Sequence, residues 1–145
     1  MPGIVVGVDG SDHSLRALEW AMKEAASHHV PLTVLAVHQV AANYWSREPI
    51  VYPEDLAAQE TAREAAEKAV AEAAGRLGQS SPASVAVHAV SGNAAHELIE
   101  ASRDTDLLVV GSRGGGGFAT LILGSTSSQV IHHAHCPVVV MPQDG

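Results

Sequence analysis

The sequence predicts an α/β fold: a single domain over residues 1–145, built on an open, five-stranded parallel sheet of order 3-2-1-4-5 with helices on both faces. Two observations support this prediction. Short apolar runs alternate along the whole chain with segments whose apolar residues recur at helical spacing, which is the pattern of successive β-α units. In addition, 46% of the residues are hydrophobic but only 3% are aromatic. The core must therefore be built from Val, Leu, Ile and Ala, as in a buried sheet beneath alanine-rich helices.

The first half of the chain supplies two strands and two helices. Residues 4–8 form a short apolar run typical of a buried strand, and residues 32–37 form a second one. A helix is expected after each strand, because apolar residues recur there on one face. These faces are Leu15, Leu18, Met22 and Ala25 in the first helix, and Ala62, Ala66, Ala69, Val70, Ala73 and Leu77 in the second.

The sequence of the second helix contains a stabilising charge pair and glycines that indicate its C-terminal end. Glu72 and Arg76 are spaced i,i+4 on its polar side and predict an ion pair. Gly75 and Gly78 predict that the helix frays at this point. The preceding stretch, residues 41–53, is rich in Pro and aromatic residues and reads either as a lid or partner surface, or as an ordinary crossover loop.

The second half of the chain repeats the alternation. Residues 84–90 alternate in polarity and predict a half-exposed third strand, whereas residues 107–110 are the most apolar run and predict a fourth. Asn93 is a good N-cap for the helix between them, which carries Leu98 and Ile99. A last helix carries Val130 and Ile131, and residues 138–141 form the fifth strand.

Composition and charge exclude several classes of protein. Eight Lys and Arg against sixteen Asp and Glu give a net charge of 8 − 16 = −8, which argues against a nucleic-acid partner because such proteins need a basic face. No apolar run is long enough to span a membrane, and the first residues do not resemble a signal peptide. Cys136 is the single cysteine, so no intramolecular disulfide forms, and a buried structural thiol is favoured over a reactive one. We therefore expect a cytoplasmic protein with no membrane association.

A ligand site is expected where the strand order reverses, at the carboxyl ends of the first and fourth strands. The residues Asp9, Gly10, Ser11 and Asp12 follow the first strand. Gly10 eases the turn and either Ser11 or Asp12 caps the next helix, which leaves Asp9 as an additional carboxylate. Asp9 either holds a metal ion bound to phosphate groups or serves as a second capping acid.

Glycines follow the fourth strand in an unusual run. Four successive glycines, residues 114–117, come directly after the most buried strand, where their N–H groups can approach an anion closely. The last helix opens at residues 124–126, and a helix N-terminus attracts anions. Thr126 and Gln129 also fit a capping box, which leaves Ser125 available for a phosphate. Neither a P-loop nor a G-x-G-x-x-G dinucleotide motif is present.

The spacing Gly111-x₂-Gly114-x₉-Gly124-Ser125 resembles the ATP-binding signature of universal stress proteins. The resemblance covers the whole chain. The further segments that carry it are Ile4–Ser11, Ser91–Ala94, Asp106–Gly114 and His135–Val140.

This resemblance implies a fold of the adenine nucleotide α-hydrolase-like, or Rossmann-like, type and ATP as the ligand, with Mg²⁺ or Mn²⁺. Asp9 is expected near the phosphates or their metal ion, Val37 offers its backbone to the adenine, and Arg113 either reaches the phosphates or is solvated. The nucleotide-binding residues implied by the resemblance are Gly7, Val8, Asp9, Val37, Val110, Gly111, Ser112, Arg113, Gly114, Gly117, Gly124, Ser125 and Thr126.

Three functions compete at this point. The favoured one is a regulatory module for the stress response in which an adenine nucleotide sets conformation or partner choice, with slow hydrolysis or none. The second is an enzyme, an ATPase or a phosphoryl or adenylyl transferase, although no general base is visible in the motif. The third is a structural dimer module that binds nothing, against which the intact glycine spacing argues. A receiver domain is excluded, because no Asp follows the third strand and no Lys follows the fifth.

Two further features bear on partners. Val138, Val139 and Val140 form a short, apolar and uncharged strand that is expected at the edge of the sheet and would pair with its own copy in a homodimer. The histidines at 132, 133 and 135 cluster in sequence, but the first two diverge on a helix. A polar helix end is therefore favoured over a metal site.

Overall fold

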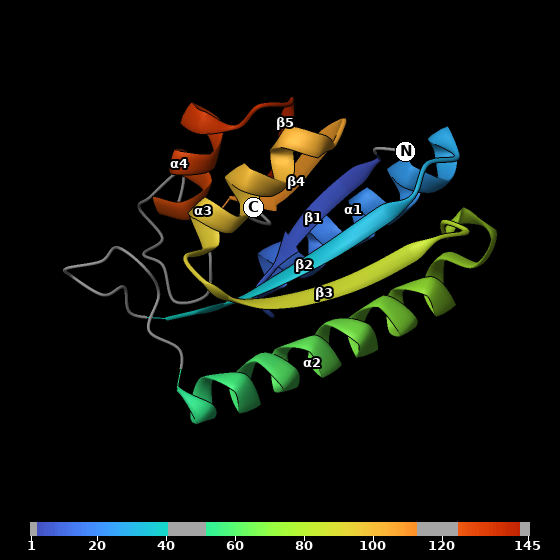
Figure 1. The fold of residues 1–145 in the computed structure, drawn as a ribbon. Coiled ribbons are helices and arrows are strands. Elements are labelled where there is room, and N and C mark those ends of the chain that lie inside the picture. Colours follow the sequence, from blue (N-terminus) through green and yellow to red (C-terminus); the bar gives the residue numbers. More distant parts are fainter. Residues whose placement is uncertain (1–2, 41–51, 113–124, 143–145) are drawn as a thin grey trace.

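The described strands of the protein form one parallel sheet, which Figure 1 shows as a ribbon. The computed structural model describes residues 3–40, 52–112 and 125–142. Its strands are β1 (Ile4–Val8), β2 (Leu32–Gln39), β3 (Val85–Gly92), β4 (Leu107–Gly111) and β5 (Val138–Met141). They lie in the order β3-β2-β1-β4-β5, and every neighbouring pair is parallel. The predicted fold class and strand order are confirmed.

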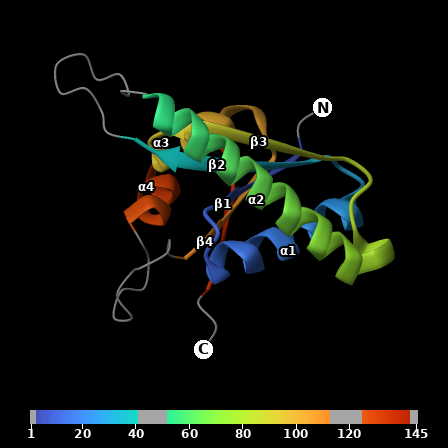
Figure 2. The same ribbon diagram turned by 90° about the horizontal axis from the view of Figure 1, so that it is seen from below.

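Within the described ranges, four helices cover the two faces of this sheet. They are α1 (Asp12–His28), α2 (Pro53–Leu77), α3 (Ala94–Ala101) and α4 (Ser125–His133), with short 3-10 turns at Gly78–Ser80 and Ser102–Asp104. Figures 1 and 2 show α1 and α2 together against one face, while α3 and α4 lie beside each other on the opposite face near the carboxyl ends of the strands. The alternating pattern of the sequence thus produces a three-layer α/β/α arrangement.

The core has two parts because side chains alternate between the faces of a strand. Val6, Val34 and Val109 are fully buried against Leu18 and Met22 of α1 on one face. The other face buries a second cluster beneath α3 and α4, made of Val5, Leu35, Ala95, Leu98, Leu108, Val110 and Val130. Strands that carry apolar residues on both faces explain why they appear as continuous apolar runs in the sequence.

Helix α1 begins at a well-formed cap. The Ser11 side chain accepts a hydrogen bond from the Ser14 backbone N–H at 3.2 Å, so Ser11 rather than Asp12 is the N-cap. Asp12 instead lies in the first turn, where a negative charge is favourable. His29 ends the helix in the left-handed conformation, with φ of 57°.

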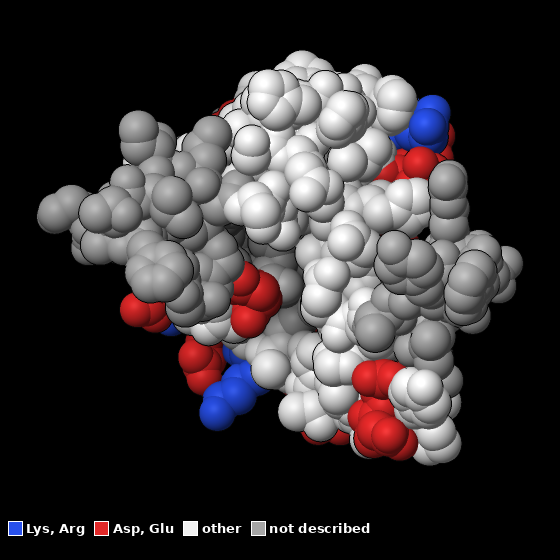
Figure 3. All heavy atoms as spheres, turned by 90° about the vertical axis from the view of Figure 1, so that its left-hand side faces the viewer, with Lys and Arg blue, Asp and Glu red and all other residues white. Residues whose placement is uncertain are grey.

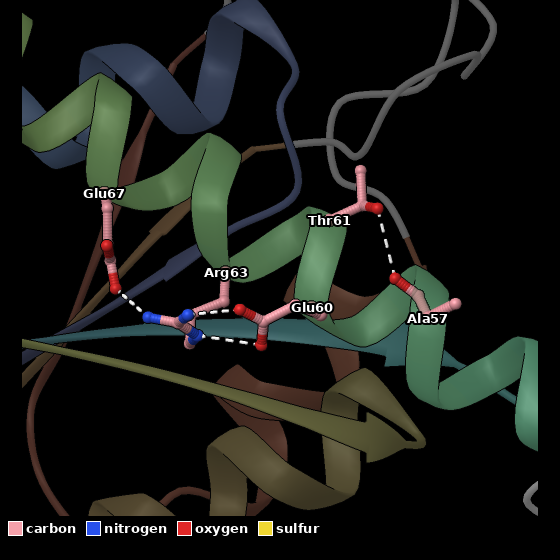
Figure 4. A network of polar contacts seen from close by, with 5 residues as sticks. All are labelled: Ala57, Glu60, Thr61, Arg63 and Glu67. Carbon is pink, nitrogen blue, oxygen red and sulfur yellow. Dashed lines mark hydrogen bonds and ion pairs between the residues drawn. The ribbon is translucent and has the colours of Figure 1, made fainter.

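Helix α2 is longer than the apolar pattern indicates. It begins at Pro53, which needs no N–H partner in the first turn, and it continues through Gly75 to end at Gly78, where φ is positive. Gly75 therefore does not mark a frayed end. Figure 4 shows its exposed surface, where Arg63 pairs with Glu60 and Glu67, while Thr61 Oγ1 donates to the Ala57 carbonyl at 3.1 Å.

The expected ion pair between Glu72 and Arg76 is not formed. Arg76 Nη2 instead lies 3.3 Å from Glu19 Oε2 of α1. This contact is possible because α1 and α2 pack side by side on the same face of the sheet (Figure 2). A tertiary partner thus replaces the local one that helical spacing predicts.

Strands β2 and β3 extend two residues beyond their predicted ends. The register pairs His38 with Ser91 and Gln39 with Gly92, so polar residues continue the ladder where the apolar pattern stops. Gln39 Oε1 then accepts a hydrogen bond from the Ala94 N–H at 3.0 Å, at the first residue of α3. The ends of these strands are therefore determined by pairing and by α3, not by hydrophobicity.

Strand β5 is an edge strand, as predicted, since it pairs with β4 alone in the described sheet. The segment that leads into β5 is held in place by Ser102, which is fully buried at the end of α3. The Ser102 hydroxyl donates to the Ile99 carbonyl at 2.5 Å and accepts from the His135 N–H at 2.9 Å. A single buried hydroxyl thereby joins the end of α3 to the segment that leads into β5.

Candidate functional site

A cavity of about 90 Å³ lies at the carboxyl ends of β1 and β4, where the strand order reverses. Figure 3 looks onto this edge of the sheet and shows a hollow near the middle of the face, with acidic atoms on one side of it. The residues that line the cavity come from β1 and the turn that follows it, from β2 and β4, and from α1, α3 and α4. They are Gly7, Val8, Asp9, Ser14, Leu35, Val37, Ala94, Leu98, Val110, Gly111, Thr126 and Ser127.

Two glycines allow helices to approach the floor of this cavity. A Cβ on Gly7 would lie 2.9 Å from Leu98 Cδ2, so α3 packs at a distance that no larger residue in β1 permits. A Cβ on Gly111 would lie 3.0 Å from His13 Cβ and 3.1 Å from the His13 carbonyl carbon. The absence of side chains at these strand ends brings α3 and α1 close to the site.

The turn after β1 fixes Asp9 beside the N-terminus of α1. The Asp9 backbone N–H donates to Ser14 Oγ at 3.1 Å, and Asp9 Oδ1 accepts from the Ser11 N–H at 2.9 Å. Ser14 is buried, whereas Asp9 is exposed at the rim of the cavity. The carboxylate therefore has a structural role in the turn and is also placed where a bound ligand would meet it.

The end of β4 is held from two sides. Ser127 Oγ of α4 donates to the Gly111 carbonyl at 2.5 Å, and the Ser112 N–H donates to the Met141 carbonyl at 2.8 Å. Among the described residues, however, two buried polar atoms have no hydrogen-bond partner: Ser112 Oγ and His13 Nδ1. Both belong to residues next to Gly111, in sequence or in space.

The structure brings seven of the predicted site residues together in this one cavity: Gly7, Val8, Asp9, Val37, Val110, Gly111 and Thr126. Ser112 is buried directly after Gly111 without lining the cavity, and Ser125 is exposed at the first position of α4. Thr126 lies within the first turn of α4, so it is not the N-cap of a capping box with Gln129. The remaining predicted residues, Arg113, Gly114, Gly117 and Gly124, lie outside the described residues.

Five lining residues were not among the predicted ones. Leu35 could have been found, because it lies two positions before Val37 and therefore on the same face of β2. Leu98 and Ala94 line the cavity because α3 packs closely on Gly7. Ser14 and Ser127 line the cavity because the first turns of α1 and α4 lie beside it. These contacts depend on how helices dock on the sheet, which no sequence pattern specifies.

A second, larger cavity of about 260 Å³ lies on the opposite face of the same strand ends, beneath α2. It shares Val8, Asp9 and Val37 with the first cavity, and its lining also includes four alanines of α2. At its border, His38 Nε2 lies 2.9 Å from Asp55 Oδ1. The Tyr52 N–H, and next the His38 side chain, hold the pKa of Asp55 below its ordinary value.

Other features of the site region are ordinary. Within the described ranges, no three His, Cys, Asp or Glu side chains are grouped so as to hold a metal ion, and none of the helices there could cross a bilayer. Burial raises the pKa of the Cys136 thiol, which keeps the sulfur in its less reactive form. The rings of His132 and His133 lie 6.5 Å apart with an angle of 62° between their planes.

Comparisons with known proteins show the family and agree with the fold. Residues 2–142 match the universal stress protein family. A universal stress protein of Mycobacterium tuberculosis is 40% identical to this chain. The matched region covers 97% of this chain and 48% of that relative. The chain thus spans about half the length of the curated relatives it matches. The solved structure of a universal stress protein from Lactobacillus plantarum is similar with a TM-score of 0.78, 25% identity and 97% coverage of both chains. Another, a universal stress protein in complex with cAMP, has a TM-score of 0.64 and 27% identity, covering 96% of this chain and 94% of the other.

Proposed function

Because the chain belongs to the universal stress protein family, we propose that it binds an adenine nucleotide, preferably ATP, in the cavity between the ends of β1 and β4. One observation carries the proposal: Asp9, Val37, Val110, Gly111 and Thr126, which are distant in the sequence, line the same cavity. A similar protein of this family is described in complex with cAMP, which supports an adenine nucleotide as the class of ligand.

The lining suits the two ends of a nucleotide. Leu35, Val37, Leu98 and Val110 provide apolar surface for a flat base. The polar end lies at the first turn of α4, where backbone N–H groups without helical partners favour an anion. The orphaned hydroxyl of buried Ser112 adds a polar group beside Gly111. The phosphates would therefore lie toward β4 and α4.

A divalent cation, Mg²⁺ or Mn²⁺, would accompany the phosphates. Asp9 is the one carboxylate among the described lining residues, and it is exposed at the rim. A single carboxylate fits a cation that is held mostly by phosphate oxygens, which is the usual way in which Mg²⁺ accompanies a nucleotide. The cation would neutralise the phosphate charge beside Asp9.

A regulatory role fits this site better than catalysis. Rapid hydrolysis needs a group that orients the attacking water, and the described lining contains no His, Glu or Gln. Backbone donors stabilise the bound triphosphate as much as the transition state, so they do not speed the reaction. Nucleotide binding would thus act in the stress response by setting conformation or partner choice, with slow hydrolysis or none.

The same proposal includes a homodimer. Val138, Val139 and Val140 lie in the edge strand β5 and are only partly buried in the single chain. An uncharged apolar edge favours pairing with a second copy across a two-fold axis. A cytoplasmic location is also part of the proposal and rests on the single cysteine and the expected nucleotide ligand.

The proposal is tested by the ligand itself. Mass spectrometry of small molecules released from the purified protein should detect an adenine nucleotide, and calorimetry should measure ATP binding. Ala94→Leu, which fills the cavity from the first turn of α3, should weaken binding at least tenfold, whereas Ala86→Leu on the exposed side of β3 should not. A folded Ala94→Leu variant with unchanged ATP affinity would contradict the placement of the site.

A further inference from the structure

Helix α1 places two basic side chains, His13 and Arg16, along the carboxyl ends of β4 and β5. They are spaced i,i+3 and so lie on the same side of the helix. His13 packs directly on Gly111, whose missing Cβ would lie 3.0 Å from His13 Cβ. Arg16 Nη1 donates to the Pro142 carbonyl at 2.8 Å, just after Met141, which pairs with Gly111 across the two strands. The two side chains thus lie against the ends of β4 and β5, next to Gly111, which itself lines the cavity.

His13 carries an unexplained polar atom. Its Nδ1 is buried and has no hydrogen-bond partner among the described residues, and the same holds for Ser112 Oγ on the other side of Gly111. A buried polar atom without a partner destabilises the protein, so two of them next to one cavity-lining residue call for a functional explanation. A ligand group that reaches past Gly111 would supply the missing partner.

Arg16 differs from the other described arginines in its pairing. Arg63 (Figure 4), Arg76 and Arg103 are each paired with at least one glutamate, whereas Arg16 donates to the neutral carbonyl group of Pro142. One contact leaves most of the guanidinium donors for other acceptors. In a chain of net charge −8, a cation with no carboxylate partner among the described residues is suited to an anionic ligand.

We propose that His13 and Arg16 contact the outer phosphate groups of the bound nucleotide and make the site select ATP over AMP. This inference rests on the proposed function, which places the phosphates toward β4 and α4. Arg16 would supply charge-assisted hydrogen bonds, and His13 Nδ1 would supply one more polar contact. AMP has no phosphate beyond the first, so it would not reach either side chain.

The test compares ATP and AMP binding by calorimetry at constant Mg²⁺ and constant pH. Arg16→Gln removes the charge, His13→Leu removes the orphaned nitrogen, and His13→Asn keeps a polar atom at the same position. Arg103→Gln is the matched control, because Arg103 is exposed and pairs with Glu100 on α3. Arg16→Lys keeps the charge if the Gln variant fails to fold.

Wild-type protein should bind ATP at least tenfold more tightly than AMP. Arg16→Gln and His13→Leu should each weaken ATP binding about tenfold and change AMP binding less than about twofold. His13→Asn should retain most of the ATP affinity, and Arg103→Gln should retain all of it. In addition, the ¹⁵N resonances of the His13 ring should shift when ATP binds and remain in place when AMP binds.

The alternative outcomes separate this inference from the proposed function. If wild-type protein binds AMP and ATP equally, or if the variants weaken both nucleotides to the same extent, the outer-phosphate role is wrong while nucleotide binding stands. If wild-type protein binds neither nucleotide, the proposed function is wrong and this inference is wrong with it.

Discussion

The contact between Gly7 and Leu98 gives a quantitative test of how α3 docks on the sheet. In Gly7→Ala, the new Cβ would lie 2.9 Å from Leu98 Cδ2 and 3.2 Å from Cδ1. Carbon atoms in ordinary contact are about 3.5–4.0 Å apart, so Leu98 must move by roughly 0.5–1 Å. Overpacking a core costs about 1–3 kcal/mol. Because the clash involves only terminal methyl groups, we expect the lower part of this range, about 1–2 kcal/mol.

The decisive measurement is a double-mutant cycle on the free energy of unfolding, determined by urea denaturation. Leu98→Ala alone should cost about 2–4 kcal/mol, since Leu98 is buried. The double variant should cost no more than Leu98→Ala alone, because the added methyl then enters vacated space. The expected interaction energy is thus about 1–2 kcal/mol in favour of the double variant.

Gly75→Ala is the matched control. A Cβ at Gly75 would meet no atom within 4 Å, and the residue lies inside α2. This variant should therefore be as stable as the wild type or more stable, by up to about 1 kcal/mol. The docking geometry would be refuted if Gly7→Ala left stability unchanged, or if its cost added to that of Leu98→Ala within about 0.5 kcal/mol.

Four other predictions concern the ligand, the assembly and the first turn of α2. Gly114→Val should abolish ATP binding in calorimetry while the circular dichroism spectrum stays that of the wild type, because a branched side chain blocks a close approach to the phosphates; unchanged affinity would exclude Gly114 from the site. Val139→Lys should convert the proposed dimer to a monomer in light scattering, since it puts a charge on the edge strand β5; a dimer that persists must use another surface. Steady-state ATP hydrolysis should stay below about 1 s⁻¹, and a faster rate that is lost in Asp9→Asn would favour the enzyme hypothesis. The pKa of Asp55 is lowered, so its contribution to stability is present above its ordinary value of 3.8 and is lost as the pH falls through the lower folded value; the difference in urea midpoint between wild type and Asp55→Ala should shrink as the pH falls below 3.8, and a difference that grew over that acidic range would contradict the sign.

Much of the fold could be predicted because the strands are apolar on both faces. Runs such as residues 4–8 and 107–110 must be buried, and the helical spacing between the strands leaves only a parallel sheet with crossover helices. The ends of β2 and β3 could not be predicted in the same way. There, His38 and Gln39 continue the strand through pairing with β3, which compensates for their polarity.

The apolar spacing of the second helix, which runs from Ala62 to Leu77, does not indicate where α2 begins, for a related reason. Its first residues are polar and follow a stretch rich in Pro, so their sequence resembles a loop. Asp55 nevertheless accepts a hydrogen bond from the Tyr52 N–H at 2.8 Å and lies against His38 of β2. One carboxylate thus both caps the helix and anchors it to the sheet, and only the second contact requires the folded chain.

The site residues likewise divide into those that the sequence predicts and those that depend on helix packing. Asp9 and Gly111 could be predicted, because topology alone brings the ends of β1 and β4 together. His13 could not be predicted, since it follows a capping serine and reads as an ordinary residue of the first helical turn. Its position against Gly111 depends on how closely α1 packs on β4, and that distance is a property of the assembled layers.

Together with a hydrogen bond at its first residue, the buried hydroxyl of Ser102 means that α3 is held at both ends. At its first residue, Ala94 lines the cavity and its N–H is bonded to Gln39. Beyond its last turn, Ser102 holds the His135 N–H ahead of β5. A sliding of α3 along its axis would strain a hydrogen bond at each end. The cavity and the edge strand are therefore connected through the eight residues of α3, in addition to the direct pairing of Gly111 with Met141.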